Sequence, residues 1–316
     1  MTPSEAAFFR RTHAKIARLR PEVIHALIRA WSIIVASFNE SELAQIIDSG
    51  NVDLLIAEAL ADQALDRALI PLRQRMRDVM HSGFTYTVPS LPRGGKINGT
   101  IAVAFDQLSP DVVAAIRSLE TPVLTRLKED VREVVRARVH DGIVAGENPR
   151  AIAKDLRSVI GLGETQYQEI QNYRDALQGL NGRSVSNYTL RSKTIDKMLA
   201  KGPLTDAQID REIAAYTKRR IALNAEATAR TATLQAFKQG QKLSWQDAQA
   251  KGVIQPNGRL VKQWLGVLDD RERPEHVAME KETVPFDEPY SNGEMTPGDS
   301  TYNCRCVEKI FIQRAA

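Results

Sequence analysis

The residue types best suited to chemistry gather near the end of the chain, where an imidazole, two thiols and several carboxylates follow one another. The set comprises Trp264, Asp269, Asp270, Arg271, Arg273, His276 and the run Cys304-Arg305-Cys306. Thiolates, an imidazole and a carboxylate are ligands that could complete a tetrahedral zinc site. A metal bound here would tie the segment between Asp269 and Cys304 to the last strand.

The spacing of these residues is nevertheless a weak metal signature. A single C-x-C with one distant His is a weaker indication of a metal site than a pair of C-x-x-C motifs. It favours two buried cysteines beside a His that hydrogen-bonds the backbone. The sequence therefore predicts no metal and no cofactor, with His276, Cys304 and Cys306 as the weak candidates.

Catalytic arrangements of the same residues are also disfavoured. His276 and Glu280 stand four apart and would share a helix face as an acid–base or metal pair, but Pro274 favours a solvated first turn there. Cys304 as a nucleophile would depend on His276, the one late imidazole. The sequence contains no phosphate loop, dinucleotide fingerprint, kinase motif set or nucleophile elbow, so we expect no enzyme.

Two charged segments point to partners rather than to catalysis. Near the N-terminus, five bases occur without an acid among them: Arg10, Arg11, Lys15, Arg18 and Arg20. They could bind phosphate, including double-stranded DNA, although a solvated helix face is the more common meaning of such a run. Residues 268–290 contain eight acids and three bases, a net charge of −5, and are expected to face protein rather than DNA.

Composition restricts the class of protein. The 316 residues are 43% hydrophobic, 26% charged and 6% aromatic, which excludes a wholly disordered chain and favours helices over a β-sandwich. The net charge of +4 is a weak field for so long a chain. Two cysteines one residue apart allow no disulfide framework, which fits a cytosolic protein. We find neither a targeting segment nor an apolar run near the ~20 residues that span a bilayer, and expect no membrane association.

Residues 1–106, the first third of the chain, are predicted to form a helical N-terminal region. Ser4 is expected to cap a first helix, a second carries the apolar stripe from Val23 to Phe38, and Asn51 is expected to cap a long segment over 53–80 that Pro71 interrupts. Residues 83–105 are predicted to form a flexible or hairpin segment, because Phe84–Val88 alternates like a strand and glycines follow.

A central helical region is expected over 107–204 and a C-terminal domain over 205–316. Helix starts are predicted at Ser109-Pro110, Thr121-Pro122 and Asn148-Pro149. A long Ala-rich helix is expected from Thr205 to Gln239, with room for a closely packed neighbour, and strands over 261–267 and 307–312. The fold class is therefore α+β and predominantly α-helical, with a long helical N-terminal region before a small mixed α/β C-terminal domain.

The late residues also resemble a known family. Ala229-Arg230-Thr231 on a helix, then Trp264, Asp269 or Asp270 with Arg271, His276, and finally Asn303-Cys304-Arg305-Cys306 resemble the phage Mu F-like head morphogenesis proteins, minor capsid proteins of tailed phages. The resemblance is specific over 205–307, looser over 107–204 and absent from 1–106. Many relatives have a Cys shortly before the His and a Gly a few residues after it; this chain has Arg273-Pro-Glu-His276 and Met279-Glu-Lys281 instead.

The resemblance implies a non-catalytic role. Its members are low-copy proteins that join the procapsid near the portal vertex in the host cytoplasm, and some are thought to bind DNA or to leave with it at ejection. The implied partners are the portal, scaffold or major capsid protein, with double-stranded DNA as a further candidate, and the implied location is the capsid interior or portal vertex. The alternatives are a zinc hydrolase or structural zinc module around His276, Cys304 and Cys306, and a helical DNA-binding protein of the host.

Overall fold

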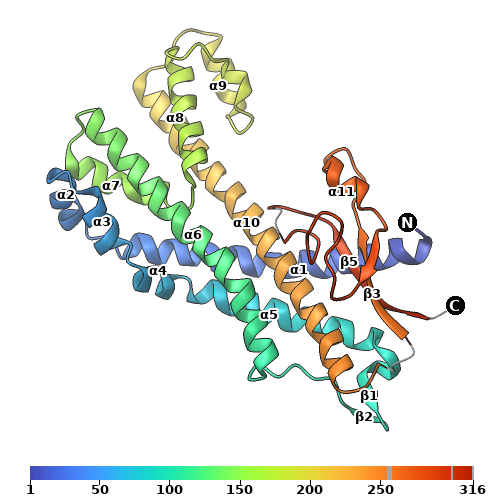
Figure 1. The fold of residues 1–316 in the computed structure, drawn as a ribbon. Coiled ribbons are helices and arrows are strands. Elements are labelled where there is room, and N and C mark those ends of the chain that lie inside the picture. The colour runs from blue at the N-terminus through green and yellow to red at the C-terminus, as the bar shows by residue number, and fades with distance from the viewer. Residues whose placement is uncertain (255–257, 300–301, 315–316) are drawn as a thin grey trace. The chain divides into compact units, whose positions relative to one another are not determined.

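Helices dominate the computed structural model, which describes residues 1–254, 258–299 and 302–314 (Figure 1). The helices are α1 (Pro3–Ala36), α2 (Glu40–Asp48), α3 (Val52–Ala59), α4 (Asp62–Ala68), α5 (Ile70–Thr87), α6 (Pro110–Val144), α7 (Pro149–Val159), α8 (Glu164–Gln178), α9 (Lys193–Leu199), α10 (Asp206–Ala250) and α11 (Pro274–Ala278). The strands are β1 (Lys96–Ile97), β2 (Thr100–Ile101), β3 (Gly258–Leu265), β4 (Thr283–Pro285) and β5 (Val307–Arg314). The predicted α+β class with a predominance of helix is confirmed.

The chain forms two compact units, each assembled from segments that are distant in sequence. The first unit contains residues 1–26, 71–123 and 227–316, and the second contains residues 27–70 and 124–226. The three consecutive regions expected from the sequence stay a prediction. No single described helix is long and apolar enough to cross a membrane. The bent pair of α1 and α2, taken together, has the length and the composition of a membrane span.

The N-terminal segment differs from the sequence prediction. One helix, α1, replaces the two that were expected, and Pro21 lies inside it. Val23 and Leu27 on its apolar stripe are fully buried, and this burial outweighs the single backbone hydrogen bond that a proline removes. The cap is Thr2 rather than Ser4: the Glu5 amide donates to Thr2 Oγ1 at 3.3 Å, and the Thr2 amide donates to Glu5 Oε2 at 2.6 Å.

The segment from Asn51 to Phe105 was only partly predicted. Asn51 does cap α3, accepting from the Leu54 amide at 3.0 Å, but three helices follow instead of one, and Pro71 lies in the first turn of α5. Phe84–Thr87 is helical rather than a strand, because Phe84 joins an apolar core. The expected hairpin is present as β1 and β2, turned by Asn98 and Gly99, which both have positive φ.

Helix starts in the middle of the chain follow their caps. Ser109 accepts from the Val112 amide at 3.3 Å, and Asn148 accepts from the Arg150 amide at 2.9 Å, as predicted. The start predicted at Thr121-Pro122 is wrong, because α6 continues through Pro122 without a break.

The long C-terminal helix packs closely against α5. The predicted helix is confirmed as α10, although it continues to Ala250 rather than ending near Gln239. Ala229, Ala232 and Ala236 on it are fully buried. A side chain at Gly83 would collide with the Phe237 carbonyl, and one at Gly240 would collide with the Met80 carbonyl, so the two helices approach backbone to backbone.

Both predicted strands of the C-terminal region are confirmed and pair with each other. The sheet has the order β4-β3-β5, all antiparallel, and Val261 faces Phe311 in its register. Leu260, Ile310 and Ile312 pack on a core that includes Leu243 and Trp245 of α10. The connection between β3 and β5 carries α11 and β4, and Figure 1 shows α11 beside the end of the sheet.

Candidate functional site

The residue pair Arg230 and Thr231 on α10 holds the segment that precedes the two thiols. Arg230 Nη1 donates to Asn303 Oδ1 at 3.0 Å, and the Asn303 amide donates to Thr231 Oγ1 at 2.9 Å. Asn303 has φ 61°, a left-handed conformation that a non-glycine residue adopts at some cost. These two hydrogen bonds fix the backbone at the point where the chain turns into the C-R-C run.

Asp269 and Arg305 form the electrostatic link across the site. Nη1 and Nη2 of Arg305 each donate to one oxygen of the Asp269 carboxylate at 2.6 Å. This hydrogen bonding lowers the pKa of Asp269 to about 2. Asp270 is exposed, so of the two acids left open by the sequence, Asp269 makes the contact. Arg271 lies 3.8 Å from the same carboxylate, with 83% of its side chain exposed.

His276, Cys304 and Cys306 meet in a buried cluster. Their ligand atoms all lie within 4.8 Å of one another. His276 Nδ1 is 3.8 Å from Cys304 Sγ and 3.5 Å from Cys306 Sγ. Both cysteines are free thiols, and the His276 side chain is 1% exposed, which contradicts the solvated position that Pro274 suggested.

Glu272 is the member of this cluster that the sequence analysis missed. Its Oε1 lies 3.3 Å from His276 Nδ1 and accepts a hydrogen bond from the Cys306 thiol at 3.3 Å. The side chain is 3% exposed. Glu280, which the sequence analysis considered and disfavoured as a partner of His276, accepts from the Gly266 amide at 2.6 Å, because α11 ends at Ala278. The four-residue spacing from Glu272 to His276, the same as that from His276 to Glu280, was the available signal in the sequence.

The two thiols differ in acidity because they interact with each other. A hydrogen bond from Cys306, helped by the charges of Lys238 and His276, lowers the pKa of Cys304. The same contact with Cys304, together with burial and the Glu272 charge, raises the pKa of Cys306. The first deprotonation of the pair is therefore easier than the second.

Trp264 forms the apolar wall of the cluster. It is fully buried, and its ring meets those of His276 and Tyr290 edge-on, with centroids 5.2 Å apart in both pairs. Its backbone pairs with the chain after α11: the Trp264 amide donates to the Glu282 carbonyl, and the Lys281 amide donates to the Trp264 carbonyl, both at 2.9 Å. The indole thus packs edge-on against the buried imidazole ring.

These motif residues lie within a recognised protein family. Residues 133–308, more than half of the chain, match the family described as Phage Mu protein F like protein. The chain belongs to the phage Mu F-like family. This is a family of phage head morphogenesis proteins, so the chain is a phage head protein by family, and residues 1–132 lie outside the match. No curated protein and no solved structure gives a significant match.

An arginine-rich cavity of about 500 Å³ adjoins the Mu F-like motif in the first unit. Its basic lining residues are His13, Arg20, Arg230, Arg271, Arg273 and Arg305. Burial lowers the pKa of His13 to about 4, so this imidazole is neutral at pH 7. Guanidinium groups that line a cavity suit a phosphate or carboxylate, although Arg305 is already paired with Asp269 and Glu272 also lines this one. Of the five N-terminal bases, Arg20 is therefore the one that lines this cavity.

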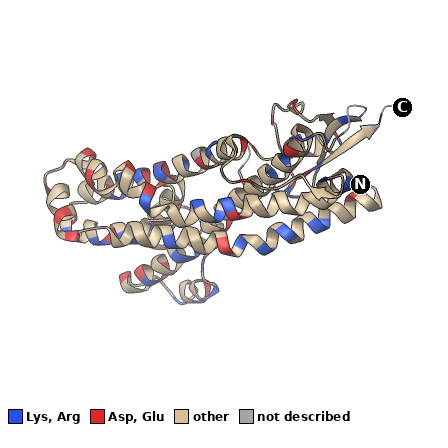
Figure 2. Cartoon of the chain, turned by 90° about the horizontal axis from the view of Figure 1, so that it is seen from below, with Lys and Arg blue, Asp and Glu red and all other residues tan. Residues whose placement is uncertain are grey.

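The remaining N-terminal bases lie on the outside of α1. Arg10, Arg11 and Arg18 are exposed and Lys15 is partly exposed. The spacing of Arg11, Lys15 and Arg18 places them on one helix face. Elsewhere Lys and Arg are interspersed with Asp and Glu along the helices (Figure 2), so this run is a local feature of a nearly balanced chain.

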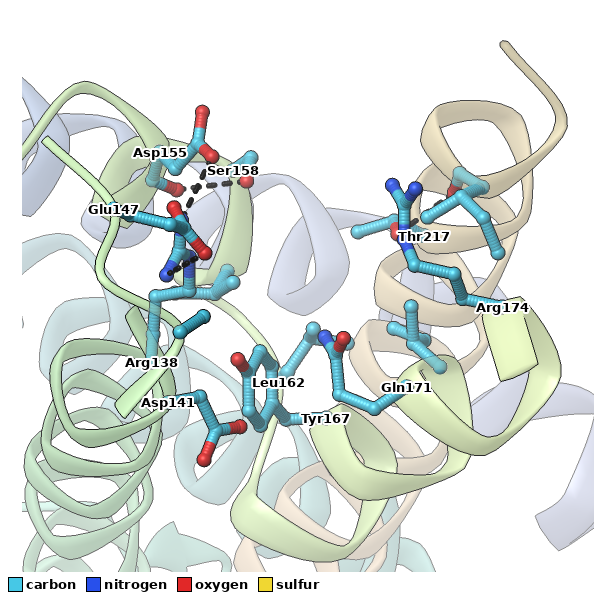
Figure 3. A pocket seen from close by; sticks show the side chains of 14 residues that line it. Arg138, Asp141, Glu147, Asp155, Ser158, Leu162, Tyr167, Gln171, Arg174 and Thr217 are labelled. Carbon is cyan, nitrogen blue, oxygen red and sulfur yellow. Dashed lines mark hydrogen bonds and ion pairs between the residues drawn. The ribbon is translucent and has the colours of Figure 1, made fainter. Parts of the chain in front are cut away.

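A second cavity, of about 460 Å³, lies within the second unit, inside the family match. Figure 3 shows Arg138 reaching toward Glu147 and Asp155, while Arg174 and Thr217 stand on the other side. Arg138 Nη2 donates to Glu147 at 2.6 Å and to Asp155 at 3.0 Å. This cavity could not be predicted from the sequence, because its lining comes from four helices, α6, α7, α8 and α10.

Proposed function

We propose that this chain is a minor head protein that enters the procapsid of a tailed phage close to the portal vertex. The observation that carries the proposal is the family match over residues 133–308, which contains the hydrogen-bonded motif from Arg230 to Cys306. In this motif the residues that resemble the family hold one another and the backbone, which suits a rigid interaction module.

The acidic segment 268–290 supports a protein partner. Asp270, Glu275, Asp287 and Glu288 are exposed, whereas Glu272 and Glu280 turn inward to the cluster and to a backbone amide. The outward acids leave a surface that favours a basic protein and repels DNA. The portal or scaffold protein would meet the chain on this side.

The exposed bases on α1 support a contact with packaged DNA. Arg11, Lys15 and Arg18 share a face, and each phosphate they neutralise would release counterions and make the contact salt-dependent. The acidic segment and this helix face are thus assigned to different partners, protein and DNA.

Head assembly in the presence and absence of the portal tests this proposal. The chain is expressed together with the portal, scaffold and major capsid genes of its phage, and purified heads are quantified by mass spectrometry. We expect far fewer copies than of the major capsid protein, loss of the chain when the portal gene is omitted, and cross-links between residues 268–290 and the portal. Heads that lack the chain, or that carry it without the portal, would contradict the proposal.

A further inference from the structure

We propose that Glu272, His276, Cys304 and Cys306 bind one Zn²⁺ ion in a closed structural site. This inference concerns the fold of the C-terminal segment and does not depend on the role in head assembly. Two of the four side chains come from the residues around the start of α11, and two from the residues that lead into β5.

Four of the six distances among the ligand atoms of these side chains are close to those of tetrahedral zinc. With Zn–S near 2.3 Å and Zn–N or Zn–O near 2.0–2.1 Å, a tetrahedron separates sulfur from nitrogen or oxygen by about 3.5 Å, and nitrogen from oxygen by about 3.3 Å. The sulfur–nitrogen distances are 3.8 and 3.5 Å, and the Cys306 sulfur lies 3.3 Å from Glu272 Oε1. The Glu272 Oε1 to His276 Nδ1 distance is 3.3 Å.

The charge and burial of the cluster favour a cation at its centre. Cys304 and Cys306 are 2% and 0% exposed, and the side chains of Glu272 and His276 are 3% and 1% exposed. A carboxylate and two thiols thus share a buried space, and the imidazole of His276 is the basic group that the described residues place in contact with them. Buried anionic groups are costly unless a cation compensates them, and a divalent ion would do so for all of them.

The surroundings hold the ligands as metal sites usually do. The Val267 amide donates to Glu272 Oε2 at 3.1 Å, which leaves Oε1 directed at the cluster. The Cys306 amide donates to Cys304 Sγ at 3.4 Å, a contact suited to a thiolate. Between the two cysteines, Arg305 points the other way to Asp269, as alternation along an extended chain requires. Such outer contacts fix the orientation of ligands before the metal arrives.

The ligand set identifies the metal and its role. Two thiolates and an imidazole select zinc over magnesium or calcium, which prefer oxygen. Catalytic zinc keeps one position for water, whereas four buried protein ligands fill a tetrahedron. The site is therefore structural, and the zinc hydrolase considered as an alternative function has less support. The ion would link the connection after β3 to the start of β5.

Metal content of the full chain is the first test. The protein is expressed in zinc-supplemented medium, freed of any histidine tag and analysed by plasma mass spectrometry. We expect about one zinc per chain, falling below about one tenth in Cys306→Ser and His276→Ala, whereas the exposed control His25→Ala retains it. Wild-type chain with less than a tenth of an equivalent and two freely titrating thiols would overturn the site.

Two further measurements keep the test valid if a cysteine variant does not fold. Wild-type chain refilled with Co²⁺ should show thiolate charge-transfer and tetrahedral d–d absorption bands, and their absence would overturn the proposal. The change Glu272→Gln should weaken zinc affinity at least tenfold relative to Glu275→Gln, an exposed neighbour in the first turn of α11. Equal affinities in these two variants would remove Glu272 from the ligand set and with it the closed site.

Discussion

At the scale of single residues, the motif is a set of mutual contacts. Asp269 holds Arg305, while Arg230 and Thr231 hold Asn303. The guanidinium of Arg305 loses its counter-charge if Asp269 changes, whereas Asp270 is exposed and is not the acid that Arg305 contacts. The acid of the pair therefore matters for stability in a way that its neighbour does not.

Replacing Asp269→Asn should lower the Tm at pH 7 by several degrees, whereas Asp270→Asn should leave it within about 2 °C. The pKa of Asp269 is lowered to about 2, so its stabilising effect is complete above about pH 4 and is lost as the pH falls toward 2. Scanning calorimetry of both variants tests this, and equal Tm values would show that the ion pair does not stabilise the fold.

A second prediction concerns Glu308, a buried acid whose pKa burial raises to about 7, in spite of the charges of Lys238, Lys262 and Lys242. Between about pH 4.5 and 7 the unfolded chain loses this proton while the folded chain keeps it. Rising pH therefore destabilises the wild type relative to Glu308→Gln, by roughly 1–3 kcal/mol across that interval. Urea denaturation from pH 4.5 to 8 measures the difference, with the exposed Glu288→Gln as control; parallel profiles would contradict it.

At the scale of elements, the contact between α5 and α10 depends on the absence of side chains. Gly83 and Gly240 each lie against the backbone of the other helix. A glycine in an exposed helix would gain stability on replacement by alanine, because alanine has the higher helix propensity. Where two helices cross this closely, replacing glycine by alanine is instead expected to lower stability.

The change Gly240→Ala should therefore destabilise the chain by roughly 1–3 kcal/mol, because the added methyl group meets the Met80 carbonyl. Gln239→Ala, one residue away and partly exposed, serves as the control. Chemical denaturation gives both values. A stabilising or neutral effect at Gly240 would show that the helices can separate at no cost.

The basic face of α1 gives a prediction for DNA. Reversal of Arg11, Lys15 and Arg18 to Glu should weaken retention of double-stranded DNA at low salt and reduce the salt slope by about 2–3, without unfolding the chain. Reversal of the exposed Lys193, Lys197 and Lys201 changes the net charge equally and serves as the control. Unchanged gel retardation by the first variant would remove the assignment.

At the scale of the whole molecule, a bound metal would stabilise the folded chain by mass action. Removing zinc with a chelator should lower the Tm of the full chain by roughly 5–10 °C, since binding at a thousand times the Kd contributes about 4 kcal/mol. Added Zn²⁺ should restore the Tm and added Mg²⁺ should not. Thermal scans before and after chelation measure this. A Tm that changes neither on chelation nor on addition of Zn²⁺ would argue against metal-linked folding.

The sequence by itself determined the features that depend on residues close together along the chain. Caps at Asn51, Ser109 and Asn148, the long helix from Thr205 and both paired strands were predicted because each depends on neighbouring residues. The family was identifiable for the same reason, since its motif is a pattern of residue types along the chain.

Only the tertiary structure decided the positions at which burial of a side chain outweighs the secondary structure that its neighbours in sequence favour. Phe84 belongs to a helix because its ring enters a core built by distant segments, and α6 continues through Pro122 despite the proline. The choice of Asp269 over Asp270, and of Glu272 over Glu280, depends on which carboxylate the fold turns inward. Adjacent acids look alike in sequence, and the physical difference between them, access to water or to a buried partner, exists only once the chain has folded.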